Sequence, residues 1–265
     1  MSRYLARRLR PSVRWAAPVL AVSLLTAGCA NGNAAPPTDS LATSSSSATT
    51  SVAPGSIAAT SPRTWSVAYL TAPLPTRAFR RLGRPVVYLT FDDGPSPTGT
   101  LAMLAVLQRH HAKATFFVIG ETAAAYPNLV REEIAAGESV GGHTWTHPHL
   151  RTLSRAAVTA QLADTRDLIR SLGAPARCFR PPYGETDSTV SSVARSLHVH
   201  QYLWTTESKD WTGAPANVDL TKALAGLQPG AIIVFHDWVP QTQQVVDQFL
   251  TIAARRGYIA AALPC

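Results

Sequence analysis

Residues 86–95 read VVYLTFDDGP, a short run rich in β-branched and aromatic residues that stops at two carboxylates. Its composition predicts a buried strand over 86–91, and the Asp-Gly-Pro sequence that follows favours a turn. A helical pattern comes next, with leucines at every third position from Leu101 to Leu107. A second buried strand is predicted at 114–118. This part of the chain therefore begins with a strand–helix–strand unit.

Strands and helices alternate along the rest of the chain. Further strands are predicted at 139–143, 177–180, 199–204, 231–235 and 258–261, and helices at 127–136, 154–173 and 242–256. This alternation favours a parallel β/α architecture, either a (β/α) barrel or, as the second choice, a Rossmann-type sheet. No GxGxxG sequence follows a strand, so dinucleotide binding has no support.

Polar side chains fall where the predicted strands end. Asp92 and Asp93 follow the first strand, His143 ends the third, Arg180 the fourth and His236 the sixth. In a parallel barrel the carboxyl ends of the strands meet at one mouth. We therefore expect a barrel with these side chains gathered at its mouth.

Composition and charge limit the classes of partner. A chain of 265 residues with 46% hydrophobic residues can bury a sizeable core. Its formal net charge of +8 depends strongly on five arginines before Cys29, in a stretch without Asp or Glu. Without that stretch the protein is only mildly basic, which suits an anionic cell wall and gives no argument for nucleic acid.

The N-terminal segment is typical of an export signal. An apolar run of roughly 10–12 residues follows the arginines, and a membrane-spanning helix needs about 20. Residues 25–29, LTAGC, resemble the lipobox of bacterial lipoproteins, although Thr26 stands where Leu is usual. We expect a signal peptide over 1–28 and lipidation of Cys29, with ordinary signal-peptidase cleavage as the alternative. The protein would then lie on the outer face of the cell membrane, or be secreted.

The remaining chain divides by composition. Residues 29–62 are almost entirely Ala, Ser, Thr, Pro, Gly and Asn, which predicts a flexible tether. A lead-in segment at 63–83 precedes the folded domain at 84–265. Cys178 and Cys265 lie in this domain, and in an exported protein they form a disulfide or remain two separate buried thiols.

Several of the polar residues suit metal chemistry. Asp92 and Asp93 can supply a metal ligand and a general base, although a solvated turn explains them as well. The spacing of four between His143 and His147 would place both imidazoles on one face of a helical turn, where they can share a divalent ion. With one carboxylate they give three ligands and leave a position for water. We interpret His149 as structural, because a fourth ligand would close the site.

Two further positions suit supporting chemistry. Arg180 begins a rigid RPPYG loop and can bind a carboxylate through two hydrogen bonds, unless the loop is only a structural turn. His236 leaves an apolar strand, where a buried structural histidine is the common alternative. Asp237 and the distant Asp210 are possible carboxylate partners, and a carboxylate favours the protonated imidazole that a general acid needs.

Five motifs together resemble those of the polysaccharide deacetylases of carbohydrate esterase family four, the NodB homology domain. In order they are TFDDGP at 90–95, HTWTH at 143–147, RPPYG at 180–184, Asp210-Trp211, and IIVFHD at 232–237. The match spans about 84–262. It implies a distorted (β/α) barrel of the NodB type and makes 84–265 a polysaccharide deacetylase catalytic domain.

The resemblance also implies roles for individual residues. These are Asp92 as general base; Asp93, His143 and His147 as ligands of one divalent ion, Zn²⁺ or else Co, Ni or Mn; Arg180 as the residue that orients Asp92; the Tyr183 N–H as oxyanion donor; His236 as general acid, tuned by Asp210; and Trp211 and Val234 as the acetyl pocket. Two departures from the family pattern concern substrate fit. Glu207 stands where Asp is usual in the fourth motif, and Val234 stands where Leu is usual in the fifth.

The expected reaction is N-deacetylation of N-acetylglucosamine units in peptidoglycan or a chitin-like glycan. O-deacetylation of acetylated xylan is the alternative within this fold, and an inert glycan-binding domain is the alternative from another class. We expect a polysaccharide as the only macromolecular partner, membrane attachment through Cys29, and a monomer.

Overall fold

The computed structural model describes residues 83–265. The predicted signal peptide at 1–28, with the lipidation of Cys29, and the tether at 29–62 lie outside the described residues, as does nearly all of the lead-in segment. Within the described part of the chain, no helix combines the length and the apolar character needed to cross a membrane.

Eight strands form a single sheet in the described residues, and every pair in it is parallel. They are β1 (Val86–Gly94), β2 (Thr115–Val118), β3 (Ser139–Gly142), β4 (Cys178–Phe179), β5 (His200–Gln201), β6 (Thr206–Glu207), β7 (Ile232–His236) and β8 (Ile259–Ala261). The order is β5-β4-β3-β2-β1-β7-β6, with β8 paired to the start of β1. This is the circular order of a barrel that is open between β5 and β6, not the reversing order of a Rossmann sheet.

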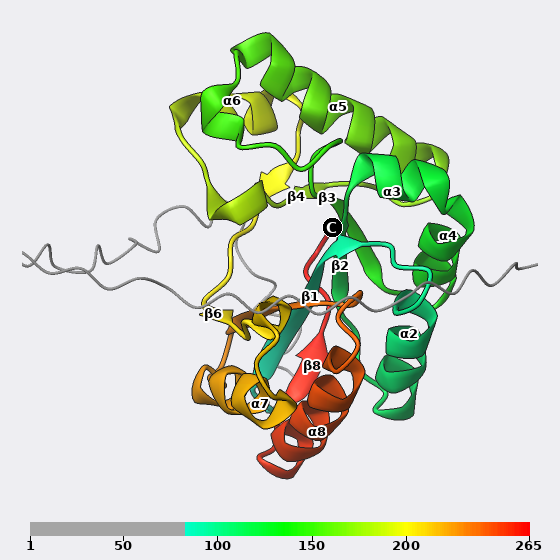
Figure 1. Ribbon diagram of the computed structural model, residues 1–265, viewed down its shortest axis with the longest axis vertical. Coiled ribbons are helices and arrows are strands. Elements are labelled where there is room, and N and C mark those ends of the chain that lie inside the picture. The colour runs from blue at the N-terminus through cyan, green and yellow to red at the C-terminus, as the bar shows by residue number, and fades with distance from the viewer. Residues whose placement is uncertain (1–82) are drawn as a thin grey trace, which may run out of the picture. The chain divides into compact units, whose positions relative to one another are not determined.

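Helices lie outside the curled sheet and cover its outer face (Figure 1). They are α2 (Thr100–Arg109), α3 (Gly120–Ala125), α4 (Pro127–Ala135), α5 (Arg155–Ser171), α6 (Ser188–Ser196), α7 (Ala216–Ala225) and α8 (Thr242–Arg255), with short 3-10 turns η2 (Leu150–Thr152), η3 (Pro182–Gly184) and η4 (Asp210–Thr212). The sequence did not predict α3, α6 and α7. In α6 the serines obscure a short apolar face, and Asp187 caps the helix by accepting a hydrogen bond from Val190 N at 2.8 Å.

The alternation of side chains along β1 divides the core. Val87, Leu89 and Phe91 are fully buried and pack outward against the helices. Tyr88 points into the barrel, where it packs with Tyr202 and other interior residues. Because side chains alternate along a strand, the inward series that includes Tyr88 leads on to Asp92 at the mouth.

A disulfide joins Cys178 in β4 to Cys265, the last residue of the chain. Of the two predicted states, the bridge is therefore the one that the structure shows. Leu263, two residues before Cys265, is buried, and its backbone N–H donates to the hydroxyl of Thr115, at the start of β2, at 2.8 Å. The C-terminal segment thus fills the end of the barrel opposite the mouth.

The double variant Cys178→Ser/Cys265→Ser is expected to unfold with a free energy about 2–4 kcal/mol lower, because the open unfolded chain has more conformational freedom. Chemical denaturation of both proteins, each with and without a reductant, measures the difference. Reductant should lower the stability of the wild-type protein and leave the variant unchanged. Equal stability of the two proteins would contradict this role.

Candidate active site

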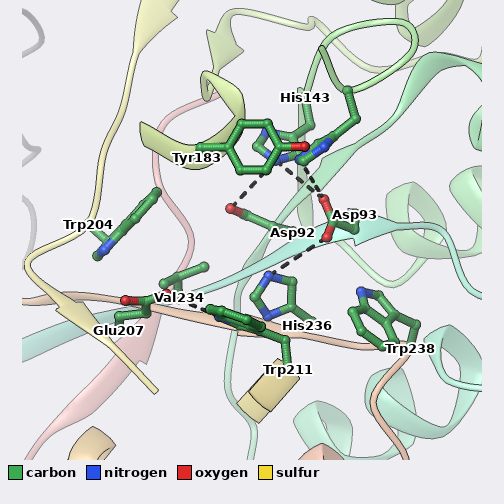
Figure 2. A pocket seen from close by; sticks show the side chains of 11 residues that line it. Asp92, Asp93, His143, Tyr183, Trp204, Glu207, Trp211, Val234, His236 and Trp238 are labelled. Carbon is green, nitrogen blue, oxygen red and sulfur yellow. Dashed lines mark hydrogen bonds and ion pairs between the residues drawn. The ribbon is translucent and has the colours of Figure 1, made fainter. Parts of the chain in front are cut away.

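A bulge at the end of β1 brings two successive carboxylates to the same mouth. Neighbouring side chains of a regular strand point to opposite faces. The pairing of β1 with β2 shifts between Asp92 and Gly94, and Asp93 has a positive φ of 67°. Such a bulge changes the direction of a side chain. Asp92 and Asp93 therefore line one pocket together (Figure 2).

His143 and His147 lie on a loop after β3, so the predicted helical turn is wrong. Thr144 and His147 have φ values of 70° and 58°, which a right-handed helix excludes. The side-chain oxygen of Gln161 in α5 stabilises the loop by accepting hydrogen bonds from two successive backbone N–H groups, at 2.8 and 2.9 Å. The loop nevertheless brings the two imidazole rings to a centroid distance of 4.9 Å.

Asp93, His143 and His147 form a group of donor atoms that fits a divalent cation. Oδ1 of Asp93 lies 3.4 Å from Nε2 of His143 and 3.3 Å from Nε2 of His147. This oxygen is buried without a hydrogen-bond partner, a costly state that a bound cation would relieve. No other group of this kind occurs in residues 83–265.

The surroundings of the two imidazoles also favour metal binding. Nδ1 of His143 lies 2.8 Å from the carbonyl oxygen of Arg180, an arrangement that leaves Nε2 free for a metal. Burial, followed by the neighbouring His143, lowers the pKa of His147. The lowered pKa favours the neutral imidazole of His147, which is the form that binds a metal.

Replacing His147 by Ala is expected to weaken zinc binding by more than about 100-fold. Loss of a residue that only hydrogen-bonds to a metal ligand already lowers metal affinity by about 10–100-fold, and loss of a ligand itself should cost more. Competition with a coloured chelator measures the affinity of the metal-free protein. His200→Ala is the matched control, since His200 is exposed on β5. An unchanged affinity in the His147 variant would show that this residue is not a ligand.

Arg180 fixes one oxygen of Asp92 from inside the barrel. Its guanidinium is fully buried, and Nη1 donates to Oδ1 of Asp92 and to the hydroxyl of Thr90, both at 2.7 Å. The group also lies 4.2 Å from the centre of the Phe117 ring. Burial lowers the pKa of Arg180, whereas Asp92 raises it. The other oxygen of Asp92 remains directed toward the pocket, 3.9 Å from Nε2 of His143.

Asp210 holds His236 at the other side of the mouth. Oδ1 of Asp210 lies 2.8 Å from Nδ1 of His236, while Oδ2 accepts from the backbone N–H of His236 at 2.8 Å and from the hydroxyl of Thr242 at 2.7 Å. Burial alone would lower the pKa of His236, but the bond and charge of Asp210 outweigh it, so this pKa is raised. The imidazolium form is therefore favoured.

Tyr183 lines the same pocket beside His147, and it lies in a strained turn. Its φ of 58° is left-handed, which a non-glycine residue adopts only when its surroundings require it. The ring stacks on His149 at 4.2 Å and meets the edge of His147 at 4.7 Å. His149 contacts Tyr183 and Glu185 and is not part of the donor group, in line with its interpretation as structural.

The pocket has a volume of about 440 Å³, and aromatic side chains form much of its wall (Figure 2). Trp211 is 52% exposed, and its indole N–H donates to Oε1 of Glu207 at 3.1 Å. Glu207, one of the two residues that depart from the family pattern, therefore holds the Trp211 indole in place. Trp204 and Trp238 lie on two other parts of the wall.

Comparison with known proteins agrees with this geometry. A family model described as polysaccharide deacetylase matches residues 80–202. A chitooligosaccharide deacetylase of Sinorhizobium fredii is 34% identical over 197 residues, which cover 69% of this chain and 92% of that protein. The chain belongs to the polysaccharide deacetylase family.

Two other members of the polysaccharide deacetylase family have a similar sequence identity to this chain. A peptidoglycan-N-acetylglucosamine deacetylase of Listeria monocytogenes is 36% identical over 173 residues, which cover 65% of this chain and 36% of that protein. A family 4 carbohydrate esterase from Streptomyces lividans, solved with acetate, has a TM-score of 0.64 at 34% identity, covering 66% of this chain and 91% of that one. The predicted family, the distorted (β/α) barrel and the class of hydrolase are confirmed.

All ten predicted site residues lie at this mouth of the polysaccharide deacetylase domain. Eight line the pocket, while Arg180 and Asp210 lie behind it and hold Asp92 and His236. Three more residues line the pocket. The sequence marked Glu207 only as a departure from the family pattern, and it missed Trp204 and Trp238. Trp204 ends one predicted strand and Trp238 follows another, and this position at the strand ends could have placed them at the mouth.

Proposed function

We propose that this chain hydrolyses the N-acetyl group of N-acetylglucosamine units in peptidoglycan or a chitin-like glycan, with zinc at Asp93, His143 and His147. One observation carries the proposal. A carboxylate oxygen, a group of three metal donors and a carboxylate-held imidazole surround one pocket. The names of the Sinorhizobium and Listeria relatives support N-acetylglucosamine as the substrate unit.

Asp92 is suited to act as the general base. A divalent ion bound by the three donors would supply Lewis acidity for the acetyl carbonyl and for the attacking water. Arg180 and Thr90 hold Asp92 from behind, and Arg180 occupies its Oδ1. The remaining oxygen, Oδ2, is then available to take a proton from water as the water attacks the carbonyl carbon.

His236 is suited to act as the general acid. Its Nδ1 bond to Asp210 leaves Nε2 facing the pocket, 3.8 Å from Oδ2 of Asp93. Because its pKa is raised, His236 keeps its proton to a higher pH than a free imidazole would. That proton passes from Nε2 to the amide nitrogen of the sugar as the carbon–nitrogen bond breaks, because an unprotonated amine leaves poorly.

Two further elements complete the proposed roles. The backbone N–H of Tyr183 would donate a hydrogen bond to the oxyanion of the tetrahedral intermediate. Trp211 and Val234 would enclose the acetyl methyl group, since both line the pocket.

The proposal includes the place of action. The arginine-rich start, the short apolar run and LTAGC at 25–29 support export, followed by lipidation of Cys29 at the outer face of the membrane or by secretion. The tether would let a monomeric catalytic domain reach the cell wall. Incorporation of a labelled fatty acid by the wild-type protein and by Cys29→Ser distinguishes the lipoprotein from the secreted form.

Acetate release tests the function directly. The purified, zinc-loaded protein is incubated with peptidoglycan and with chitin oligosaccharides, and acetate is measured together with the mass of the products. We expect a loss of one acetyl group per modified sugar. If no N-acetylated glycan releases acetate, the proposed function is wrong.

A further inference from the structure

Asp237 follows the proposed acid His236 directly, but it takes no part in the mechanism above. Its side chain is fully buried, and Oδ1 has no hydrogen-bond partner. Burial raises the pKa of Asp237 to about 6. A buried carboxylate costs free energy unless its contacts offset that cost, so the contacts that Asp237 makes need an explanation.

The side chain of Asp237 binds the turn that joins β1 to α2. The hydroxyl of Thr100 donates a hydrogen bond to Oδ2 of Asp237, and the same hydroxyl accepts from the backbone N–H of Ser96 at 2.7 Å. The other end of this turn, at Gly94, also lies close to the side chain of Asp237. A Cβ added to Gly94 would lie 3.3 Å from Oδ1 of Asp237.

The backbone of Asp237 is enclosed by the same turn. A Cβ at Gly99 would lie 1.8 Å from the carbonyl oxygen of Asp237, an approach that only glycine permits. The side-chain amide of Gln243 in α8 donates to that carbonyl at 3.2 Å. Asp237 is therefore fixed through both its side chain and its main chain.

The two joined segments carry residues with different proposed roles. The β1–α2 turn follows Asp93, one of the three metal donors, and Asp237 follows His236. The ladder between β1 and β7 ends with the pair Asp92 and His236, so no later strand pairing holds these segments together. Beyond that pair, Oδ2 of Asp93 and Nε2 of His236 face each other at 3.8 Å (Figure 2).

We propose that Asp237 is a positioning residue that, through Thr100, fixes the metal-donor turn against the strand end that carries the acid. The inference rests on the proposed function for the roles of Asp93 and His236. Catalysis depends on placing the reacting groups to within fractions of an ångström. Loss of the contact would therefore slow the chemical step, with little effect on glycan binding in the pocket, because Asp237 does not line it.

Thr100→Val tests the contact, because it keeps the shape of the buried side chain and removes the hydroxyl. We expect zinc affinity and kcat each to fall by about 10–100-fold, the range typical for loss of a residue that orients a metal ligand, with KM changed less than threefold. Thr100→Ser should restore both values. Adding Thr100→Val to Asp237→Ala should cause no further loss, because both changes remove the same interaction.

Thr115→Val is the matched control. Thr115 is equally buried, and it accepts a hydrogen bond from Leu263 N at the opposite end of the barrel. This control should lower the melting temperature without changing zinc affinity or kcat. The proposal is overturned if Thr100→Val changes neither quantity, if Thr100→Ser fails to restore them, or if Thr115→Val lowers them equally.

Zinc affinity is measured on the metal-free protein by chelator competition, without any substrate. If the wild-type protein releases no acetate, the proposed function fails, and the affinity series still decides whether Asp237 and Thr100 position the metal-donor turn.

Discussion

Replacing Asp92 by Asn is expected to lower kcat for acetate release by about 10²–10⁴-fold, the range typical for loss of a general base. An amide has nearly the same shape as the carboxylate, and its oxygen can still accept the hydrogen bond from Arg180. It cannot take a proton from water. The loss should therefore appear in the chemical step, with zinc affinity changed little because Asp92 is not one of the three donors.

The rate of acetate release and the zinc affinity are measured on the same preparations. Asp187→Asn is the matched control, since Asn caps a helix as well as Asp, and Asp187 caps α6 without lining the pocket. Activity close to that of the wild-type protein in Asp92→Asn would move the base elsewhere. A parallel fall in zinc affinity would instead make Asp92 a ligand.

The main architecture follows from the sequence because its longest strands have clear patterns. β1 and β7 are apolar runs that end at polar residues, and the helices between strands have regular apolar faces. The two-residue strand β6 (Thr206–Glu207) has no such pattern, because its pairing depends on β7 rather than on its own composition. Short elements of this kind are set by tertiary contacts.

In the site, too, part of the structure follows from the sequence and part depends on contacts between segments. The motifs predicted which residues meet, but the spacing of His143 and His147 did not reveal their loop. That loop depends on two hydrogen bonds that its backbone N–H groups donate to the side-chain oxygen of Gln161, which lies in α5, outside the motif. The bulge at Asp93 likewise arises from pairing with β2. Residue type predicts the chemistry here, whereas distant contacts set the direction of each side chain.

Replacing His236 by Ala is expected to lower kcat by about 10²–10⁴-fold on an N-acetylated glycan, the range typical for loss of a general acid. An acetyl ester should lose far less, because an alkoxide leaves more easily than an amine anion. Acetate release from a chitin oligosaccharide and from acetylated xylan, assayed with the same enzyme preparations, measures both effects. The ratio of ester to amide activity should therefore rise in the variant.

The outcome also separates the two hydrolytic alternatives. If the wild-type protein prefers acetylated xylan and His236→Ala affects both substrates equally, the N-deacetylase proposal is wrong. The pH profile gives a second criterion. Because the pKa of His236 is raised, the protonated acid persists to higher pH, and wild-type amide hydrolysis should decline only as that proton is lost on the alkaline side. Asp210→Asn removes the carboxylate that favours the imidazolium, so its alkaline decline should begin at lower pH while the acid itself remains in place.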